Sequence, residues 1–293
     1  MHIHFGFDIA YQLPSAATTL LMLRLRPELE GRLLAPERFK IAPETPFEEY
    51  TDAFGNRCMR ISAPAGLLEL SCDGTIEDSG NPAPIATDAC WHPVSELPTE
   101  LLPYLLPSRF CEVDLLGDLA WSLFDGTPRG WARVQAVCDW VHSHLHFDYL
   151  RARPTLTAYE AFREGGGVCR DFTHLAVALC RCLNIPARYV TGYLGDIGVP
   201  PDSAPMDFSA WMEVYLGGRW HTFDPRHNER RIGHLAMAHG RDAADVPLTT
   251  SFGTHWLRRF SVITEEVSAP TAIRSPLGAE SPDIGAQTGC KVA

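Results

Sequence analysis

The chain has 293 residues, 45% of them hydrophobic, which is enough for a substantial core and favours two domains over one. Its formal net charge of −11 at pH 7 argues against a nucleic-acid partner or an anionic membrane, since both need a basic protein surface. No apolar run approaches the roughly 18 residues of a membrane span, and the first residues lack the basic and apolar segments of a signal peptide, so we expect a cytoplasmic protein.

Residues 1–80 have the pattern of a small β domain. Ile3, Phe5 and Phe7 alternate with polar or small residues, as on a half-buried strand. No cluster of histidine, cysteine and acid predicts chemistry in this part of the chain. Residues 81–109 are rich in proline, which breaks regular structure and indicates a linker or a strap that wraps the surface.

Residues 110–267 have the mixed pattern of a second domain. Apolar residues first follow helical spacing and then the alternation of strands, with Gly217-Gly218 as the turn of a hairpin. Residues 268–293 lack periodicity and are expected to be a disordered tail. The expected helices cover 115–124, 131–144, 158–163 (capped by Thr157) and 169–183, and the expected strands cover 187–194, 209–216, 219–224 and 259–264.

The stretch from Gly165 to Pro186 carries the strongest functional signal. Three consecutive glycines predict a tight turn just before Cys169, because each glycine costs roughly 1 kcal/mol in a helix interior. Apolar residues from Phe172 to Leu183 then follow the i, i+3, i+4, i+7 spacing of a buried helix. We therefore expect Cys169 in the first helical turn, where unpaired N–H groups and the helix dipole favour a thiolate.

Four motifs follow one another in a characteristic order. They are Gly-Val-Cys-Arg-Asp-Phe at 167–172, Ile-Pro-Ala-Arg-Tyr-Val-Thr-Gly-Tyr-Leu at 185–194, Ala-Trp-Met-Glu-Val-Tyr-Leu at 210–216 and Trp-His-Thr-Phe-Asp-Pro at 220–225. Together they resemble the bacterial transglutaminase-like superfamily, in its cysteine protease branch, over residues 110 to 265. The resemblance implies an α+β fold with a papain-like core, in which a helix with an N-terminal cysteine packs on an antiparallel sheet, preceded by a small β domain.

The resemblance also implies a catalytic triad of cysteine, histidine and aspartate. The nucleophile corresponds to Cys169 and the acid that orients the histidine corresponds to Asp224. The histidine position holds Ser209, whose hydroxyl cannot act as a base near pH 7. His227 is the candidate substitute base, ahead of His221, because a spacing of three residues on a strand puts His221 and Asp224 on opposite faces.

We therefore expect a cysteine-dependent amide-bond enzyme, either a peptidase or amidase or a transglutaminase-type acyl transferase, that forms a thioester on Cys169. The alternative is a weak or inactive relative that binds a peptide or an amide-containing ligand. Neither a metal nor another cofactor is expected, although the spacing of His142 and His146 leaves a metal protein as a third alternative. The pattern predicts no oligomeric state. Candidate substrate-binding residues are Arg170, Trp211 and Tyr193, with an ion pair the alternative for Arg170 and a place in the core or cleft wall the alternative for Trp211.

Overall fold

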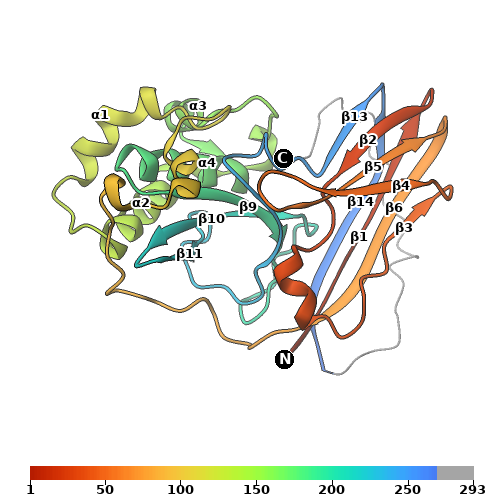
Figure 1. Cartoon of the computed structure of the whole chain (residues 1–293), viewed down its shortest axis with the longest axis horizontal. Helices are drawn as coiled ribbons and strands as arrows, with labels where there is room; N and C mark the ends of the chain where they lie inside the picture. The colour runs from red at the N-terminus through yellow and green to blue at the C-terminus, as the bar shows by residue number, and fades with distance from the viewer. Residues whose placement is uncertain (269–293) are drawn as a thin grey trace.

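The computed structural model describes residues 1–268 (Figure 1). Within these residues the chain forms four α-helices, three four-stranded antiparallel sheets and one short parallel strand pair. Figure 1 shows the four helices at one end of the molecule, two of the sheets at the other end, and strands β9 to β11 between them. The fold class is α+β, as expected.

Two of the sheets form a β sandwich, and its core also includes buried residues of the second domain, among them Tyr193 and Leu235. Their strand orders are β14-β1-β6-β3 and β13-β2-β5-β4. Ile3, Phe5 and Phe7 of β1 are buried in this core, as their alternation predicts. The strands are β1 (His2–Leu13), β2 (Ala17–Leu21), β3 (Lys40–Ala42), β4 (Phe47–Thr51), β5 (Arg57–Ala63), β6 (Gly66–Glu77), β13 (Thr249–Phe252) and β14 (Trp256–Val267).

The last two described strands belong to this sandwich. β14 pairs antiparallel with β1, with Val267 opposite His2 and Trp256 opposite Gln12, and β13 pairs with β2. The assignment of residues 249–267 to the second domain is therefore wrong. The local pattern gives the strand but not its partner, which lies at the opposite end of the chain. All but the first residue of the expected tail, 268–293, lie outside the described residues.

The third sheet and the helices form the second domain. The sheet has the order β11-β10-β9-β12, and α4 packs against β9 and β10 while α1, α2 and α3 surround it. Every residue of α4 after Cys169 is buried. The elements are α1 (Val113–Phe124), α2 (Trp131–His144), β7 (His146–Phe147), α3 (Ala158–Glu164), β8 (Gly166–Gly167), α4 (Cys169–Cys182), β9 (Ala187–Tyr193), β10 (Ser209–Leu216), β11 (Arg219–Phe223) and β12 (Leu235–Gly240).

Local hydrogen bonds position the start of α4. Helix α3 begins with a capping box, in which Thr157 Oγ1 accepts from the Glu160 N–H at 3.2 Å and Glu160 Oε2 accepts from the Thr157 N–H at 3.0 Å. It ends at Gly165, whose φ of 67° is the left-handed conformation that favours glycine. Asp171 Oδ2 then accepts from the Val168 N–H at 2.9 Å, so α4 begins at Cys169, the residue that the sequence predicted in its first turn.

The proline-rich segment between β6 and α1 lies along the second domain. It contains two 3-10 turns, Val94–Glu96 and Thr99–Leu105. The Trp91 indole N–H donates to the Asn184 carbonyl at 3.0 Å, and the Gly217 N–H donates to the Cys90 carbonyl at 2.9 Å. These contacts tie the segment to the end of α4 and to the β10–β11 turn.

Candidate active site

Cys169, the first residue of α4, lines a cavity of about 100 Å³. The walls come from Phe147 and Tyr149, from the segment 194–209 that leads into β10, and from residues 226–231 after β11. Ser209 and His227 line the same cavity as Cys169. The structure therefore brings together the expected nucleophile, the residue at the family histidine position and the candidate substitute base.

The Cys169 thiol lies in surroundings that favour its neutral form. Burial raises its pKa to about 11, and the nearby Asp207 carboxylate adds to this effect. The Arg226 guanidinium and a hydrogen bond from the Ala210 N–H act in the opposite direction. The thiolate expected from the helix terminus is thus outweighed by burial, and Cys169 needs a base to remove its proton near pH 7.

Asp224 and His227 form a hydrogen-bonded pair. His227 Nδ1 lies 2.6 Å from Asp224 Oδ2, and Asp224 Oδ1 accepts from the N–H groups of Arg226 and His227, each at 3.1 Å. The carboxylate is almost fully buried, with 2% of its side chain exposed. Burial alone would raise its pKa, but the hydrogen bond of His227 and the nearby His234 imidazole hold the Asp224 pKa well below its usual range.

The turn that follows β11 brings His227 to the cavity. Met212 of β10 lies opposite Phe223, the last residue of β11. The chain then turns, with the Asn228 N–H donating to the Asp224 carbonyl at 2.8 Å, and Arg226 and His227 line the same cavity as Ser209. The turn after Asp224 therefore runs beside the start of β10, and His227 enters the cavity next to the position that holds histidine in the resembled family.

The two ring nitrogens of His227 have different neighbours. Nδ1 faces the Asp224 carboxylate, so Nδ1 carries the hydrogen and Nε2 is the acceptor in the neutral ring. The Arg226 guanidinium contacts Nε2, and it also lies over the Phe147 ring, 4.1 Å from the ring centroid. Nε2, the only nitrogen able to accept a proton from a thiol, is therefore in contact with Arg226.

The sequence analysis missed three residues at this site. Asp207 and Arg226 act on the Cys169 thiol through their charges, and both line the cavity. His234 Nε2 lies 3.9 Å from Asp224 Oδ2, and the His234 ring packs edge-on against Trp211. Asp207 and Arg226 stand close to the Ser209 and Asp224 motifs in sequence, so their neighbourhood was the available signal; His234 carried none.

His221, the other candidate base, and His174, which lies on the same helix as Cys169, do not line the cavity. His221 is buried, with Nε2 3.1 Å from the Leu216 carbonyl and its ring packed edge-on against Trp131. His174 Nε2 accepts from the Ala243 N–H at 3.1 Å inside the protein. The preference for His227 over His221 therefore agrees with the geometry.

The three candidate substrate-binding residues do not line the cavity. Arg170 is 5% exposed and pairs with Asp171 at 3.0 Å. Trp211 and Tyr193 are 1% and 0% exposed, and Tyr193 packs against Phe5 and Phe208. A sequence position next to a catalytic motif did not reveal which way these side chains point, and we remove them from the site.

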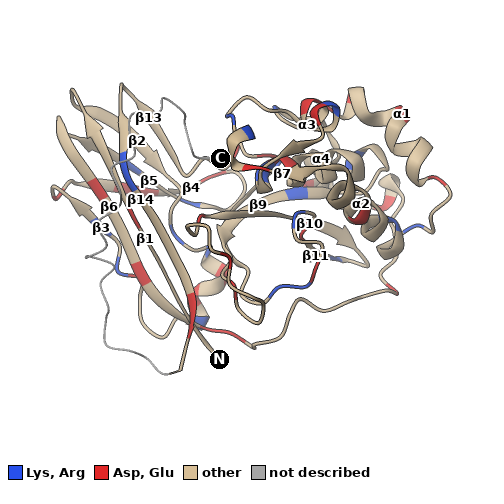
Figure 2. Ribbon diagram, turned by 180° about the vertical axis from the view of Figure 1, so that it is seen from behind, with Lys and Arg blue, Asp and Glu red and all other residues tan. Residues whose placement is uncertain are grey.

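The described residues offer no group of three or more histidine, cysteine or acidic side chains placed to hold a metal ion. His142, considered with His146 as a metal ligand, has its Nδ1 2.8 Å from the Arg226 carbonyl. No helix within residues 1–268 has the length and apolar character needed to span a membrane. Figure 2 shows acidic and basic residues interspersed over the sandwich and the helical domain.

Comparisons with known proteins place this cavity in a family context. The model of the transglutaminase-like superfamily matches residues 119–225, which include Cys169, Ser209 and Asp224. The crystal structure of a proposed cysteine protease from Cytophaga hutchinsonii superposes with a TM-score of 0.77 and 29% identity, over 93% of this chain and 92% of that chain. The similarity to that structure thus extends over the β sandwich as well.

Curated relatives match over shorter regions. An uncharacterized protein of Mycobacterium leprae is 30% identical over 138 residues, which are 45% of this chain and 48% of that protein. The human kyphoscoliosis peptidase is 28% identical over 115 residues, 37% of this chain and 17% of that protein. The alignments thus span less than half the length of these curated relatives.

Proposed function

We propose that this chain, which belongs to the transglutaminase-like superfamily, is a cysteine-dependent amide-bond enzyme that uses Cys169, His227 and Asp224. Cys169 is the nucleophile, His227 is the general base and acid, and Asp224 orients His227. The hydrogen bond of 2.6 Å between His227 Nδ1 and Asp224 Oδ2, with His227 and Cys169 on one cavity, carries the proposal. The name of the Cytophaga relative supports a peptide or related amide as substrate.

The proposed reaction has two steps. His227 Nε2 accepts the Cys169 proton as the sulfur attacks the amide carbonyl, and His227 then donates that proton to the departing amine, which leaves a thioester on Cys169. In the second step His227 removes a proton from water, which attacks the thioester and releases the carboxylic acid and the thiol. A second amine in place of water gives acyl transfer; we favour hydrolysis because nothing in the amino-acid sequence indicates a dedicated amine site.

The same pair of residues supplies the electrostatics of this reaction. Asp224 keeps the hydrogen of His227 on Nδ1 and stabilises the imidazolium that forms when Nε2 is protonated. The N–H of Cys169 lies in the first turn of α4, where helix N–H groups have no partner within the helix. This N–H helps to hold the oxyanion of the tetrahedral intermediate.

A binding protein without catalysis is the second candidate. The Cys169 pKa of about 11 and the contact of Arg226 with His227 Nε2 favour it, because both oppose formation of a thiolate. The His227–Asp224 pair argues for the enzyme, since a binding protein has no need of an imidazole oriented by a buried carboxylate.

The pH dependence of Cys169 alkylation by iodoacetamide separates the two candidates. We expect the wild-type protein to react below pH 8 through thiolate formed with the help of His227, and Cys169→Ser to lose this reaction. In His227→Gln the rate is expected to follow one ionisation near the pKa of about 11 that burial imposes on Cys169. Peptide mapping by mass spectrometry assigns the alkylation to Cys169.

His221→Gln is the matched control, since His221 is a histidine of the same hairpin that lies away from the cavity. It is expected to keep the wild-type profile, and circular dichroism checks the fold of each variant. A wild-type profile equal to that of His227→Gln rejects the enzyme and leaves the binding protein. The cytoplasmic location remains part of the proposal and is checked by fractionation of the cells that produce the protein.

A further inference from the structure

We infer that the substrate carries a free carboxylate next to the amide that is cleaved, and that Arg226 is the residue that recognises it. This inference rests on the proposed function, because it names the substrate class of the same cavity. Arg226 then has two states: in one it contacts His227 Nε2, and in the other it binds the substrate carboxylate and leaves Nε2 able to accept the thiol proton.

The contacts of Arg226 suit this role. Its guanidinium lies on the Phe147 ring and against His227 Nε2, neither of which is an acidic group, and this leaves its positive charge available to an anion. Arginine binds a carboxylate through two parallel hydrogen bonds, a geometry that an aromatic ring beneath the guanidinium does not obstruct. When a carboxylate binds, Arg226 replaces its contact with His227 Nε2 by a stronger ion pair.

The position of Arg226 places the carboxylate close to the reacting amide. Arg226 lines the cavity with Cys169, and its charge acts directly on the thiol. A group bound to Arg226 is therefore adjacent to a carbonyl at Cys169. The cavity of about 100 Å³ holds only a small group, so the carboxylate belongs to the residue at the cleaved bond, either as a chain terminus or as an acidic side chain.

Other charged groups also line the cavity and could compete with Arg226 for the carboxylate or repel it. Arg231 is paired through Nη2, with Asp196 at 2.9 Å and the Gly195 carbonyl at 2.9 Å, while its buried Nε has no hydrogen-bond partner among the described residues. Asp202 lies on the exposed loop, where it accepts from the Ala204 N–H at 2.9 Å. Asp207 raises the pKa of the Cys169 thiol, and its negative charge opposes an anionic substrate. The inference requires the attraction of Arg226 to exceed this repulsion.

Iodoacetate and iodoacetamide form a matched pair of probes for this question. They alkylate a thiolate at the same carbon and differ only in the carboxylate or carboxamide beside it. The ratio of their rates is measured at Cys169 and, in the same protein, at the exposed Cys90 as an ordinary thiol. We expect the iodoacetate-to-iodoacetamide ratio at Cys169 to exceed that at Cys90 at least tenfold and the iodoacetate rate to saturate with concentration.

Variants of Arg226 connect this preference to one residue. Arg226→Gln is expected to reduce the ratio at Cys169 to the Cys90 value, and Arg226→Lys to retain part of it. Arg129→Gln is the control, because the Arg129 guanidinium also lies over an aromatic ring, that of Trp91 at 4.7 Å. It is expected to leave the ratio unchanged.

Two results overturn the inference. If the iodoacetate-to-iodoacetamide ratio at wild-type Cys169 is no higher than at Cys90, repulsion by Asp207 exceeds attraction by Arg226. If a high ratio remains in Arg226→Gln, another group recognises the carboxylate. Failure of the proposed function gives a different result. In that case the pH profile of Cys169 alkylation is the same in wild type and in His227→Gln, whatever the iodoacetate-to-iodoacetamide ratio.

Two further measurements test the release of His227 and the source of the carboxylate. If binding frees Nε2, His227→Gln slows iodoacetate more than iodoacetamide; an equal loss contradicts the release. N-acetylglycine supplies a main-chain carboxylate and N-acetylaspartic acid α-amide supplies a side-chain carboxylate. The one that protects Cys169 from iodoacetate at the lower concentration identifies the source, and protection by neither contradicts carboxylate recognition.

Discussion

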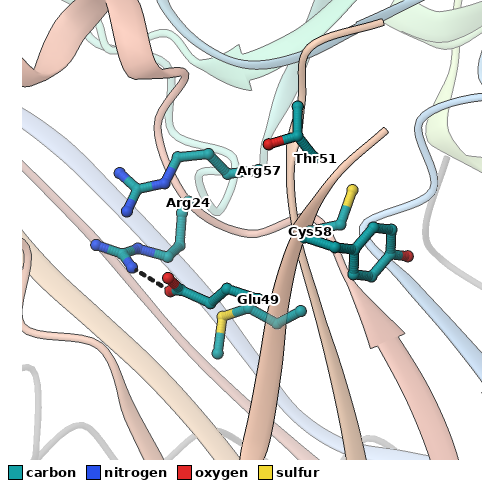
Figure 3. Close-up of a pocket in the computed structure, with 7 residues that line it drawn as sticks. Arg24, Glu49, Thr51, Arg57 and Cys58 are labelled. Atoms are coloured by element: carbon teal, nitrogen blue, oxygen red, sulfur yellow. Dashed lines mark hydrogen bonds and ion pairs between the residues drawn. The ribbon is translucent and has the colours of Figure 1, made fainter. Parts of the chain in front are cut away.

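Two cavities of this molecule each contain a cysteine whose pKa is raised to about 11 by burial. One is the cavity at Cys169. The other, of about 150 Å³, lies on the β sandwich and is lined by Cys58 together with Arg24, Glu49 and Arg57 (Figure 3). In both, a nearby aspartate raises the thiol pKa further, Asp207 at Cys169 and Asp52 at Cys58.

The cavities differ in what surrounds the thiol. In the sandwich cavity Arg24 is bound to Glu37 and Glu49 at 2.9 Å and 2.7 Å, the second of which is drawn in Figure 3. Arg57 pairs with Glu30. Within residues 1–268 no histidine lines that cavity, whereas His227 lines the cavity of Cys169. A cysteine beside arginines thus occurs in both cavities, and the histidine oriented by Asp224 is what makes one of the two a candidate active site.

The largest expected difference between the cavities is in turnover. Cys169→Ser is expected to lower the hydrolysis rate of a fluorogenic peptide amide by about 10³-fold or more, because the nucleophile is lost. Cys58→Ser is expected to change it less than about twofold, since Cys58 lies in the other cavity, where its thiol donates to the Asn56 carbonyl at 3.6 Å. Equal losses for the two variants contradict the assignment of the nucleophile.

Asp224→Asn tests the orienting carboxylate. We expect turnover to fall by about 10²- to 10⁴-fold, because an amide no longer stabilises the imidazolium of His227. The same carboxylate affects stability: its folded-state pKa is depressed, so its contribution is complete above the unfolded value of about 4 and is lost as the pH falls further, at about 1.4 kcal/mol per unit of depression.

Urea unfolding at pH 7 and at pH 3 measures that contribution. The wild-type protein is expected to lose more unfolding free energy between the two pH values than Asp224→Asn, which has no carboxylate to protonate. Parallel losses in the two proteins show that Asp224 is not the depressed group.

Asp207→Asn is expected to change the pKa of the Cys169 thiol and not that of the Cys58 thiol. Loss of the negative charge near Cys169 is expected to lower the pKa of that thiol below its value of about 11. The midpoint of the alkylation profile against pH gives the shift. Asp52→Asn, which removes the corresponding charge near Cys58, is the control and leaves the Cys169 profile unchanged.

The smallest expected effect is at the sandwich cavity. Glu49→Gln breaks the ion pair with Arg24. The Glu49 side chain is 47% exposed and the Arg24 side chain is 18% exposed. Such pairs contribute about 0.2 to 1 kcal/mol, and the contribution decreases with salt. Urea unfolding at low and high salt measures it, and turnover stays at the wild-type rate. A loss of turnover links this cavity to function.

Much of the local structure was predictable from the sequence. Helix α2 has the predicted bounds, Trp131 to His144, and Thr157 caps α3 as expected. The β10–β11 hairpin turns at Gly217-Gly218, whose φ values of 57° and 86° are those that glycine adopts readily. Each of these features depends on residues close together in the chain, so the local pattern contains the information.

The site itself was predictable only in part. The glycine turn and the apolar stripe determined that Cys169 begins a buried helix, and the motif order placed Asp224 at the end of a strand. Which histidine joins Asp224 depended on the path of the turn after β11. The directions of Arg170, Trp211 and Tyr193 depended on packing against elements distant in sequence.

The sequence by itself therefore indicated α2, α4 and the β10–β11 hairpin and pointed to Cys169 as the candidate nucleophile, but it indicated neither β12 nor β13. The tertiary structure decided that β13 and β14 return to the sandwich and that His227 and Arg226 meet beside Ser209. It also decided that burial and Asp207, which raise the Cys169 pKa, outweigh the helix terminus, which was expected to lower it. Pairing partners and pKa values depend on which groups fold next to one another and how much water they lose, and a local pattern of residues specifies neither.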